Sequence, residues 1–462
     1  MKKKIILIDL DCSVIHSVAR SNVLQIDTLI VGSESNIVKI QKKYNIPIVL
    51  SWYDVNEYFT KRNIKLDYSI IEIFRNTQLK VEHFFSRVTS DLNTQEYLYY
   101  CALSFWLDRF KKEKIDAVFS SSLEFGGLFD SVIFDVAQYY KKHVFLLEIS
   151  LCNGDIVSNS VFDYTNKRYV KIDIKKYNLK KINKNDFLFK AKLISSNNSI
   201  KKISLKEMVL TILEKIGGFL LPSLMLCLFG KYKIKHHSFF INWWEYFNGF
   251  LFSKRIYRYY NSLCIDYDSS QKYIYYSLHM EPEASILART VFSNQLVIIK
   301  TIAQNLPNGW KLYVKEHPHQ HQNFNNSTVY YFLPTLYKFK TKRFYDEIIK
   351  LPNTYLIKSN ISSKIILEKS VAASSINGTI FFESLIMGKP FISFSQNTSA
   401  LTNVNGIFDI KNNDDCKNAL EILEKGYQPD YDNLDSVIEN YYYEVEKNQK
   451  NNFDLLFEDL LK

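Results

Sequence analysis

The segment WKLYVKEHPHQH, residues 310–321, places a histidine where it could contact a phosphate group. Its Lys315, Glu316, His317 and Pro318 follow a run that is typical of a buried strand. Pro318 cannot continue a sheet ladder, and it biases His317 toward an extended conformation. An imidazole at a strand end can donate to a phosphate oxygen and stabilise the charge on a departing nucleotide. We therefore predict that His317 binds a nucleotide phosphate and takes part in catalysis, and that Lys315 is a second phosphate contact or a residue at the edge of the core.

A second candidate lies at residues 374–384, SSINGTIFFES, where small residues precede a helical segment. The chain turns at Gly378 and a helix opens near Thr379, so the helix dipole and the exposed N–H groups could bind an anion. Glu383 follows one turn later on the same side, where its carboxylate could accept hydrogen bonds from ribose hydroxyls. Helix capping by Thr379 and Glu383 is the simpler explanation, and it is compatible with ligand binding. The predicted nucleotide-binding residues of this segment are Ser374, Ser375, Gly378, Thr379 and Glu383.

Polar side chains also crowd the segment YYSLHMEPEAS, residues 275–285, at another junction between a strand and a helix. His279, Glu281 and Glu283 come just before the predicted helix. Acidic residues in a first helical turn often only complement the helix dipole. Because these groups share one sheet edge with His317, we predict that His279 and Glu281 contribute to the same site.

The first part of the chain offers a carboxylate that could act on a second substrate. The segment AVFSSSLEFGGLFD, residues 117–130, places Glu124 just beyond a strand and before two glycines. A carboxylate within hydrogen-bond reach of a hydroxyl can remove its proton. We predict Glu124 as a catalytic base, with a polar loop residue as the alternative. Asp9 and Asp11 also sit at a strand end, and as a pair they are the weaker candidate.

Strand-like and helix-like segments alternate in both parts of the chain, which indicates α/β architecture with doubly wound parallel sheets. In the first part, strands are predicted at 5–10, 28–31, 47–50, 117–120 and 144–148, with helices at 97–112 and 129–140. In the second part, strands are predicted at 273–277, 310–315, 354–357, 371–374 and 390–395, with helices at 284–305, 344–350, 361–370 and 379–387. Ligands of such sheets bind beyond the carboxyl ends of the strands, where the polar segments lie.

Two stretches between these parts break the alternation. Residues 151–205 are polar and rich in Lys and Asn, and we expect an irregular connector or insertion there. Residues 208–229 are strongly apolar, but Glu214, Lys215 and Pro222 leave less than the roughly 20 uninterrupted residues that a membrane span requires. Basic and aromatic residues follow, which suits a helix lying on an anionic membrane surface. A buried helical hairpin is the other interpretation.

The net charge of +11, from 59 Lys and Arg against 48 Asp and Glu, is compatible with anionic membranes or phosphorylated substrates. The sequence contains no concentrated basic arm or recognition motif, so we expect no nucleic-acid partner. The six cysteines form no C-x-x-C pair, which fits a reducing cytosol. Asp9 and Asp11 interrupt the apolar N-terminal run, which therefore predicts a first buried strand rather than a signal peptide.

Five motifs occur in an order that is shared with a known group of enzymes. The series YYSLHMEPEAS, NQ, LPNGWKLYVKEHP, FYDEIIKLPNTYLI and INGTIFFESLIMGKPFISF, within residues 272–396, resembles the bacterial capsule polysaccharide biosynthesis glycosyltransferases. The resemblance implies a GT-B fold, in which two Rossmann-like domains face a cleft and the C-terminal domain binds the nucleotide-sugar donor. The expected domains are 1–165 for the acceptor, 166–270 as a connector with a helical and aromatic insertion, 271–410 for the donor, and 411–462 as C-terminal helices.

The pair His317-Pro318 is also similar to the motif with which GT-B sialyltransferases and Kdo transferases hold the cytidine monophosphate of their donors. That similarity implies that His317 contacts the donor phosphate and that Ser374 or Ser375 assists. A CMP-activated sialic acid or Kdo-like sugar is therefore the first choice of donor, while UDP-sugars, GDP-sugars and CDP-polyols stay open. GT-B enzymes generally need no bound metal, so we expect no metal and no other cofactor.

Glu124-Phe125-Gly126 is similar to the acidic-acidic-Gly motif that carries the base in some sialyltransferases, but this chain has Phe125 at the middle position. The resemblance as a whole implies a glycosyltransferase that extends a capsule or lipopolysaccharide type of glycan. The expected partners are a nucleotide sugar, a glycan or glycolipid acceptor and an anionic membrane surface, at the cytoplasmic face of the membrane. The alternatives are a polyol-phosphate transferase, a UDP-sugar-using GT-B enzyme or epimerase, and a non-catalytic polysaccharide assembly protein.

Overall fold

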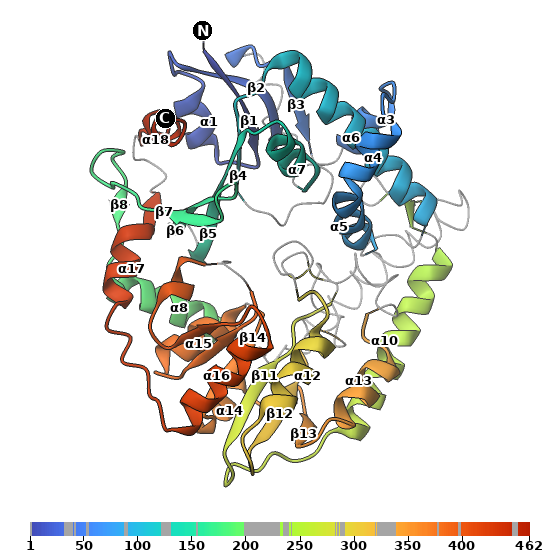
Figure 1. The fold of residues 1–462 in the computed structure, drawn as a ribbon, viewed down its shortest axis with the longest axis vertical. Helices are drawn as coiled ribbons and strands as arrows, with labels where there is room; N and C mark the ends of the chain where they lie inside the picture. Colours follow the sequence, from blue (N-terminus) through green and yellow to red (C-terminus); the bar gives the residue numbers. More distant parts are fainter. Residues whose placement is uncertain are drawn as a thin grey trace, which may run out of the picture.

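The computed structural model describes residues 2–31, 40, 43–51, 55–86, 91–121, 131–153, 156–197, 232–233, 240–241, 243–281, 283, 286, 292–318, 320, 339–376, 378–395, 399–445 and 451–462. The chain forms two α/β halves, each built around a twisted sheet with helices on both faces (Figure 1). The parallel strands of both sheets point their carboxyl ends toward the middle of the molecule (Figure 1). This confirms the prediction of two Rossmann-like, doubly wound sheets.

The first sheet has the strand order β3-β2-β1-β4-β5-β6-β17-β8, with β7 paired to β6. Its parallel strands are β1 (Lys3–Ile8), β2 (Leu24–Val31), β3 (Ile48–Ser51), β4 (Ala117–Ser120) and β5 (His143–Asn153). An antiparallel extension adds β6 (Ile156–Asp163), β7 (Arg168–Val170), β8 (Lys180–Lys181) and β17 (Tyr443–Val445). The chain order reverses between β1 and β4, so the ligand crevice of this half is expected there.

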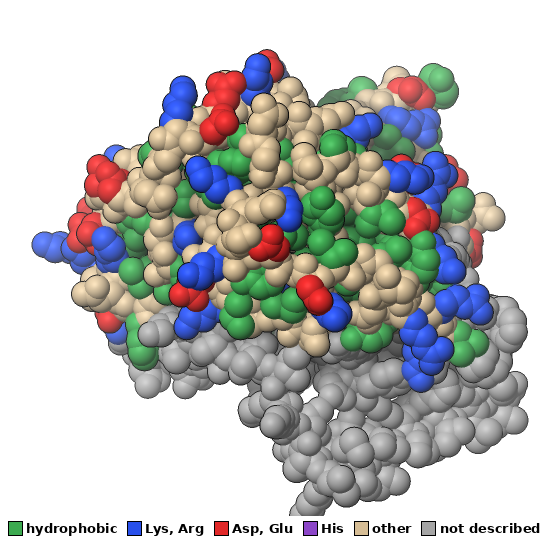
Figure 2. Space-filling model, turned by 90° about the horizontal axis from the view of Figure 1, so that it is seen from below, with side chains coloured by type: hydrophobic (Ala, Val, Ile, Leu, Met, Phe, Trp, Pro, Cys, Tyr) green, Lys and Arg blue, Asp and Glu red, His purple; other side chains and the backbone are tan. Residues whose placement is uncertain are grey.

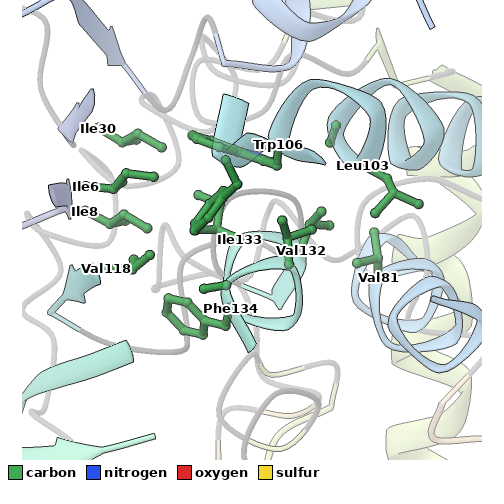
Figure 3. Close-up of a cluster of buried hydrophobic side chains, with 14 of the residues drawn as sticks. Ile6, Ile8, Ile30, Val81, Leu103, Trp106, Val118, Val132, Ile133 and Phe134 are labelled. Carbon is green, nitrogen blue, oxygen red and sulfur yellow. The ribbon is translucent and has the colours of Figure 1, made fainter. Parts of the chain in front are cut away.

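Continuous apolar runs make these strands, because parallel strands are covered on both faces. Figure 3 shows Ile6, Ile8, Ile30 and Val118 from the sheet facing Trp106 and the α7 side chains. The helices of this half are α1 (Cys12–Val18), α3 (Val55–Thr60), α4 (Tyr68–Ile73), α5 (Arg75–Phe85), α6 (Leu92–Glu113) and α7 (Ser131–Tyr139). Each fully buried aliphatic or aromatic side chain contributes roughly 1.5–3 kcal/mol to stability.

The second sheet is wholly parallel and has the order β13-β12-β11-β14-β15-β16. Its strands are β11 (Tyr273–Ser277), β12 (Lys311–Lys315), β13 (Thr354–Ile357), β14 (Ala372–Ser375), β15 (Phe391–Ser393) and β16 (Ile407–Asp409). The helices between them are α12 (Gln295–Asn305), α13 (Lys342–Ile349), α14 (Ser363–Lys369), α15 (Thr379–Ile386), the short 3₁₀ turn η4 (Ala400–Asn403) and α16 (Asn413–Glu424). Here the order reverses between β11 and β14, which makes their carboxyl ends the expected ligand site.

The C-terminal end of the chain returns to the first half. After α17 (Leu434–Tyr441), β17 pairs with β6 and β8, and α18 (Phe453–Leu460) packs against α1. The Phe457 ring stacks on Phe119 of β4 with centroids 3.8 Å apart, and Ser17 donates to Asp454 at 2.8 Å. The last residues therefore complete the core of the first half, next to the N-terminus in Figure 1.

Further elements join the halves. Helix α8 (Lys184–Asn197) packs against α15, and α10 (Trp243–Leu263) packs against α13. The short strands β9 (Tyr232–Lys233) and β10 (Phe240–Ile241) pair with each other. Among the helices that the structure describes, none is long and apolar enough to cross a membrane. The segment 208–229, for which we predict either an interfacial helix or a buried hairpin, lies outside the described residues.

Two sequence predictions are wrong. Residues 151–205 are not simply irregular, because they contain the end of β5, strands β6 to β8 and α8. These strands belong to the antiparallel part of the sheet, in which one face can stay exposed, so their many Lys and Asn residues hide the pattern. The single helix predicted at 284–305 is also interrupted, because Ile286 is helical but residues 292–294 are not, and α12 begins only at Gln295. The Asn294 side chain accepts from Leu296 N at 2.9 Å, which caps the helix at that point.

The surface of the second half carries both signs of charge. Figure 2, which views the molecule from below, shows basic and acidic side chains interspersed with apolar ones over this face. The net positive charge of the chain therefore does not appear on this face as a single basic patch.

Candidate active site at the switch point of the second sheet

The two serines at the end of β14 hold the sheet together at its switch point. Ser375 Oγ donates to the carbonyl of Ser277, the last residue of β11, at 2.8 Å. Ser374 Oγ donates to the carbonyl of Ile392 in β15 at 2.9 Å. Both side chains are buried. The hydroxyl hydrogens of both serines are therefore used within the sheet. Contact with a nucleotide-sugar substrate stays a prediction, and in such a contact the serine oxygens would have to accept hydrogen bonds.

Gly378 opens helix α15 and brings an imidazole onto its N-terminus. The residue is the N-cap, with φ of 101° and no side-chain cap, and Thr379 is the first helical residue. A Cβ on Gly378 would lie 3.2 Å from His279 Cε1 and 3.5 Å from Nε2. Glycine readily adopts this φ, and a Cβ in its place would crowd the ring. The predicted residues Gly378, Thr379 and His279 are thus brought together at a helix end that favours anions.

Strand register places the two histidines at the same level of the sheet edge. Ser277 of β11 pairs with Lys315 of β12, and each histidine comes two residues later, as His279 and His317. His279 Nδ1 lies 3.2 Å from a carboxylate oxygen of Glu283, which orients the ring. His317 is half-buried. Because β11 and β12 are neighbours, both histidines lie just beyond the carboxyl ends of these strands, where the ligand crevice of such a sheet is expected.

Two buried glutamines fix the loops that carry these histidines. Gln295 accepts from His279 N at 2.8 Å and donates to Glu281 Oε1 at 2.7 Å. Gln320 accepts from Glu281 N at 2.7 Å and donates to the Glu281 carbonyl at 2.8 Å. The N–H of Gln320 also donates to the His317 carbonyl at 2.9 Å, which closes a turn. Glu281, predicted as a donor contact, is therefore buried and acts in holding the two loops together.

A buried cation lies between two carboxylates beneath this site. Lys340 Nζ is 3.7 Å from Glu281 Oε2 and 3.7 Å from Glu316 Oε2, and within the described part of the chain it makes no hydrogen bond. Glu316 accepts from Tyr345 OH at 2.5 Å and from His317 N at 2.8 Å. Burial raises the pKa of Glu316, while Lys340 and the Tyr345 hydrogen bond act in the opposite direction. Glu316 thus fixes the backbone of His317 and links it to Glu281 through Lys340.

Lys315 and Glu383 lie on the other side of the histidines. Lys315 is buried, and its Nζ donates to the Ile361 carbonyl at 2.8 Å and to Ser363 Oγ at 2.7 Å. This agrees with the prediction of a residue at the edge of the core. Burial raises the pKa of Glu383, and the charge of Lys315 acts against this. Glu383 follows Thr379 by one helical turn, as predicted, and its carboxylate lies near the positive charge of Lys315.

His83 of α5 approaches the site from the first half, and sequence reasoning missed it. Its ring lies 12° from parallel to the Phe339 ring, with centroids 6.3 Å apart. Surrounding protein lowers the pKa of His83 by desolvation, and the nearby Glu281 carboxylate acts in the opposite direction. No sequence signal marks His83, because its place depends on how the two halves pack. Gln295 belongs to the Asn-Gln pair of the motif series, and its spacing before α12 is the signal that could have found it.

Two sequence predictions concern the catalytic base on the acceptor side and the absence of a metal ion. Glu124, the predicted base, lies outside the described residues and stays a prediction. Among the described residues, no group of three or more His, Cys, Asp or Glu side chains could hold a metal ion. The expectation that the enzyme works without a metal or other cofactor is untested and also stays a prediction.

No protein-family model matches the sequence, and no curated protein matches it. Solved structures do resemble the fold. They include UDP-GlcNAc 2-epimerase from Methanocaldococcus jannaschii, with 12% identity, coverage of 100% of this chain and 99% of that chain, and a TM-score of 0.26. The beta Kdo 2,7 transferase KpsC from Thermosulfurimonas dismutans has 12% identity, coverage of 76% and 82%, and a TM-score of 0.28. A glycosyltransferase from Rickettsia africae has 11% identity, coverage of 100% and 98%, and a TM-score of 0.27.

Proposed function

We propose that the chain is a glycosyltransferase whose nucleotide-sugar donor binds at the switch point between β11 and β14. One observation carries the proposal: the His279 imidazole stands over the glycine-opened N-terminus of α15, with Glu383 one turn further along the helix. A phosphate there would meet backbone N–H groups, a helix dipole and an imidazole at once. The carboxylate of Glu383 would accept hydrogen bonds from the ribose hydroxyls.

The two histidines suit the departure of a nucleotide phosphate. When the bond between the sugar and the phosphate oxygen breaks, negative charge grows on the phosphate. Preorganised donors aimed at that charge contribute most when they need no rearrangement during the reaction. Gln295, Gln320 and Glu316 hold the backbones of both histidine loops from within the protein. His279 and His317 would therefore meet the leaving phosphate from a rigid support.

We further propose a CMP-sugar donor, with a sialic acid or a Kdo-like sugar. The support is the similarity of His317-Pro318 to the motif of GT-B sialyltransferases and Kdo transferases, together with the place of His317 beside His279. The acceptor would be a growing surface glycan or glycolipid, and transfer would take place at the cytoplasmic face of the membrane, without a metal ion. An anionic membrane surface would attract the net charge of +11.

A thermal-shift screen of the full chain against CMP, CDP, UDP and GDP tests donor binding. A ligand that binds only the native state raises stability, by about 2.7 kcal/mol when its concentration is 100 times Kd. We expect the largest shift with CMP, and we expect slow hydrolysis of CMP-N-acetylneuraminate or CMP-Kdo. A larger shift with UDP, together with UDP-sugar hydrolysis, would instead assign a UDP-sugar donor.

The variants His279→Ala and His317→Ala should each weaken nucleotide binding and slow hydrolysis by at least tenfold. His143→Ala is the matched control, because His143 is an exposed histidine at the start of β5 in the other half. If no nucleotide shifts the wild-type melting temperature and no nucleotide sugar is hydrolysed, the proposed function is wrong. If both site variants behave like His143→Ala, the site has been placed wrongly.

A further inference from the structure

Asp9 lies at the switch point of the first sheet, between β1 and β4. This point corresponds to the switch point between β11 and β14 in the second sheet. Ile8 of β1 pairs with Ser120 of β4, so Asp9 and Ser121 are each the next residue beyond the paired ends. Ser121 Oγ donates to Asp9 Oδ2 at 3.0 Å, and Asp9 N donates to the Ile30 carbonyl of β2 at 2.8 Å. The carboxylate of Asp9 is therefore held from β4, and its backbone is held from β2.

A serine at the switch point bridges the two central strand ends in both halves, to a backbone carbonyl in the second half and to a carboxylate in the first. In the second half, Ser375 at the end of β14 donates to the last residue of β11. In the first half, Ser121 after β4 donates to the residue that follows β1. Both sites lie at the carboxyl ends of their strands, and these edges face the middle of the molecule from opposite sides (Figure 1). A two-substrate enzyme needs one binding site on each side, and the first half offers Asp9 there.

The backbone of Asp9 is held in an uncommon conformation. Its φ is 51°, in the left-handed region that residues other than glycine rarely occupy. Such residues persist where the surroundings fix them, and they concentrate at functional sites. Here the hydrogen bonds to Ile30 and from Ser121 fix the residue. The left-handed turn separates Asp9 from Asp11, which is the exposed N-cap residue of α1 and makes no side-chain cap.

The environment of Asp9 favours proton exchange near neutral pH. Burial raises the pKa of Asp9 to about 7, the Ser121 hydrogen bond acts in the opposite direction, and repulsion from Asp11 adds to the rise. Tyr443 of β17 also lies near Asp11, and burial raises the pKa of its hydroxyl, so it stays neutral. A base works best when its pKa is close to the working pH.

We propose that Asp9 is the general base that activates the attacking hydroxyl of the acceptor, a role that the sequence pattern assigns to Glu124. This proposal rests on the proposed glycosyltransferase function. One Asp9 carboxylate oxygen accepts the hydroxyl proton while the hydroxyl oxygen bonds to the anomeric carbon. The bond from that carbon to the donor phosphate oxygen breaks, and its electron pair leaves with the nucleotide. Attack from the face opposite the nucleotide inverts the anomeric configuration, and Asp9 then releases its proton to water.

Hydrolysis of nucleotide sugars tests the proposal, because water can take the place of the acceptor. The full chain is assayed with CMP-N-acetylneuraminate, CMP-Kdo and UDP-GlcNAc, and the rate is followed across the pH range. The wild-type rate should rise through a limb near the Asp9 pKa of about 7. Asp9→Asn should lose that limb and 10²–10⁴-fold in rate, about the usual contribution of a general base. Nucleotide binding, measured by thermal shift, should stay within about twofold of wild type, because the donor binds in the other half.

Three further variants separate a base from a structural residue. Ser121→Ala should move the limb to higher pH, because the hydrogen bond that lowers the Asp9 pKa is lost. Asp11→Asn is the matched control: it should keep the plateau rate and move the limb slightly to lower pH, because a repelling charge is removed. Glu124→Gln compares the two candidates for the base, and the proposal requires that the limb persists in this variant.

The possible failures are distinguishable. If Asp9→Asn hydrolyses the donor within threefold of the wild-type rate, Asp9 is not the base although the proposed function stands. Loss of the limb in Glu124→Gln instead of Asp9→Asn gives the role to Glu124 and overturns the proposal. If the wild type binds no nucleotide and hydrolyses none of the three donors, the proposed function fails, and the role of Asp9 fails with it.

Discussion

Replacing Lys340 by methionine tests whether the buried cation between Glu281 and Glu316 holds the two histidine loops in place. Methionine has a similar length and fills the same space, so the change removes a charge and little volume. The side chain of Lys340 is 1% exposed, and the carboxylates facing it are 10% and 1% exposed. Without the cation, two buried carboxylates would face each other across the site of the missing ammonium group.

The expected cost follows from the two separations of 3.7 Å. At an effective dielectric constant of about 20, each attraction is worth roughly 4 kcal/mol, so about 8 kcal/mol of attraction is lost. The variant no longer desolvates an ammonium ion on folding, which returns several kcal/mol. The net loss should therefore be about 3–5 kcal/mol, the usual result of breaking a buried ion pair from one side.

Urea unfolding at about pH 8 and about pH 5 measures this loss and its pH dependence. The pKa of Glu316 is already raised by burial, and removing Lys340 raises it further. A raised folded-state pKa means that stability is present below the unfolded pKa and is lost as the pH rises. The penalty of Lys340→Met should therefore be larger at about pH 8 than at about pH 5. The double variant Lys340→Met with Glu316→Gln should recover about 1–3 kcal/mol.

Lys350→Met is the matched control for this measurement. Lys350 forms a shorter ion pair of 2.9 Å with Glu347, but the two side chains are 66% and 39% exposed. An exposed pair is screened by solvent and contributes little to stability. Equal losses in the free energy of unfolding for Lys340→Met and Lys350→Met would refute the reasoning, because the expected difference depends on burial and not on the ion-pair distance.

Three other predictions concern separate parts of the chain. Gly378→Ala should destabilise the protein by about 1–2 kcal/mol more than Gly426→Ala and should weaken CMP binding. Both glycines have positive φ, but only the Cβ added at position 378 would crowd an imidazole. Melting curves with and without CMP measure the difference. Asp9→Asn should be as stable as wild type at about pH 4 and up to about 4 kcal/mol more stable above pH 7, because its raised pKa makes ionisation costly in the folded state; urea unfolding at both pH values tests the sign. Phe457→Ala should cost about 3–5 kcal/mol in the free energy of unfolding, whereas exposed Leu455→Ala should cost less than about 0.5 kcal/mol; similar losses would show that α18 is not part of the core.

Most of the second half could be predicted from its sequence. Strands at 273–277 and 354–357 match the structure at both ends, and those at 310–315 and 371–374 match within one residue. Fully buried parallel strands are short apolar runs bounded by turns, so local sequence marks them well. The helix start at Thr379 was equally clear, because Gly378 precedes it. Residues 151–205 were missed because these antiparallel strands can leave one face exposed and carry mixed polar and apolar residues without a regular period.

The site divides in the same way between sequence and tertiary structure. The sequence alone determined that His279 and His317 follow strands and that Gly378 opens a helix, because strand and helix ends depend on local residues. It also placed them in a doubly wound sheet, whose strand ends form the ligand crevice.

Only the tertiary structure decided what each polar group does there. Glu281 is a neighbour of Lys340 and Gln320, and Lys315 bonds to the loop before α14, through contacts that join residues far apart in the chain. The raised pKa of Asp9 and the return of β17 to the first sheet likewise depend on packing. Burial and long-range pairing determine the role of a charged side chain, and neither can be predicted from the residues next to it in the sequence.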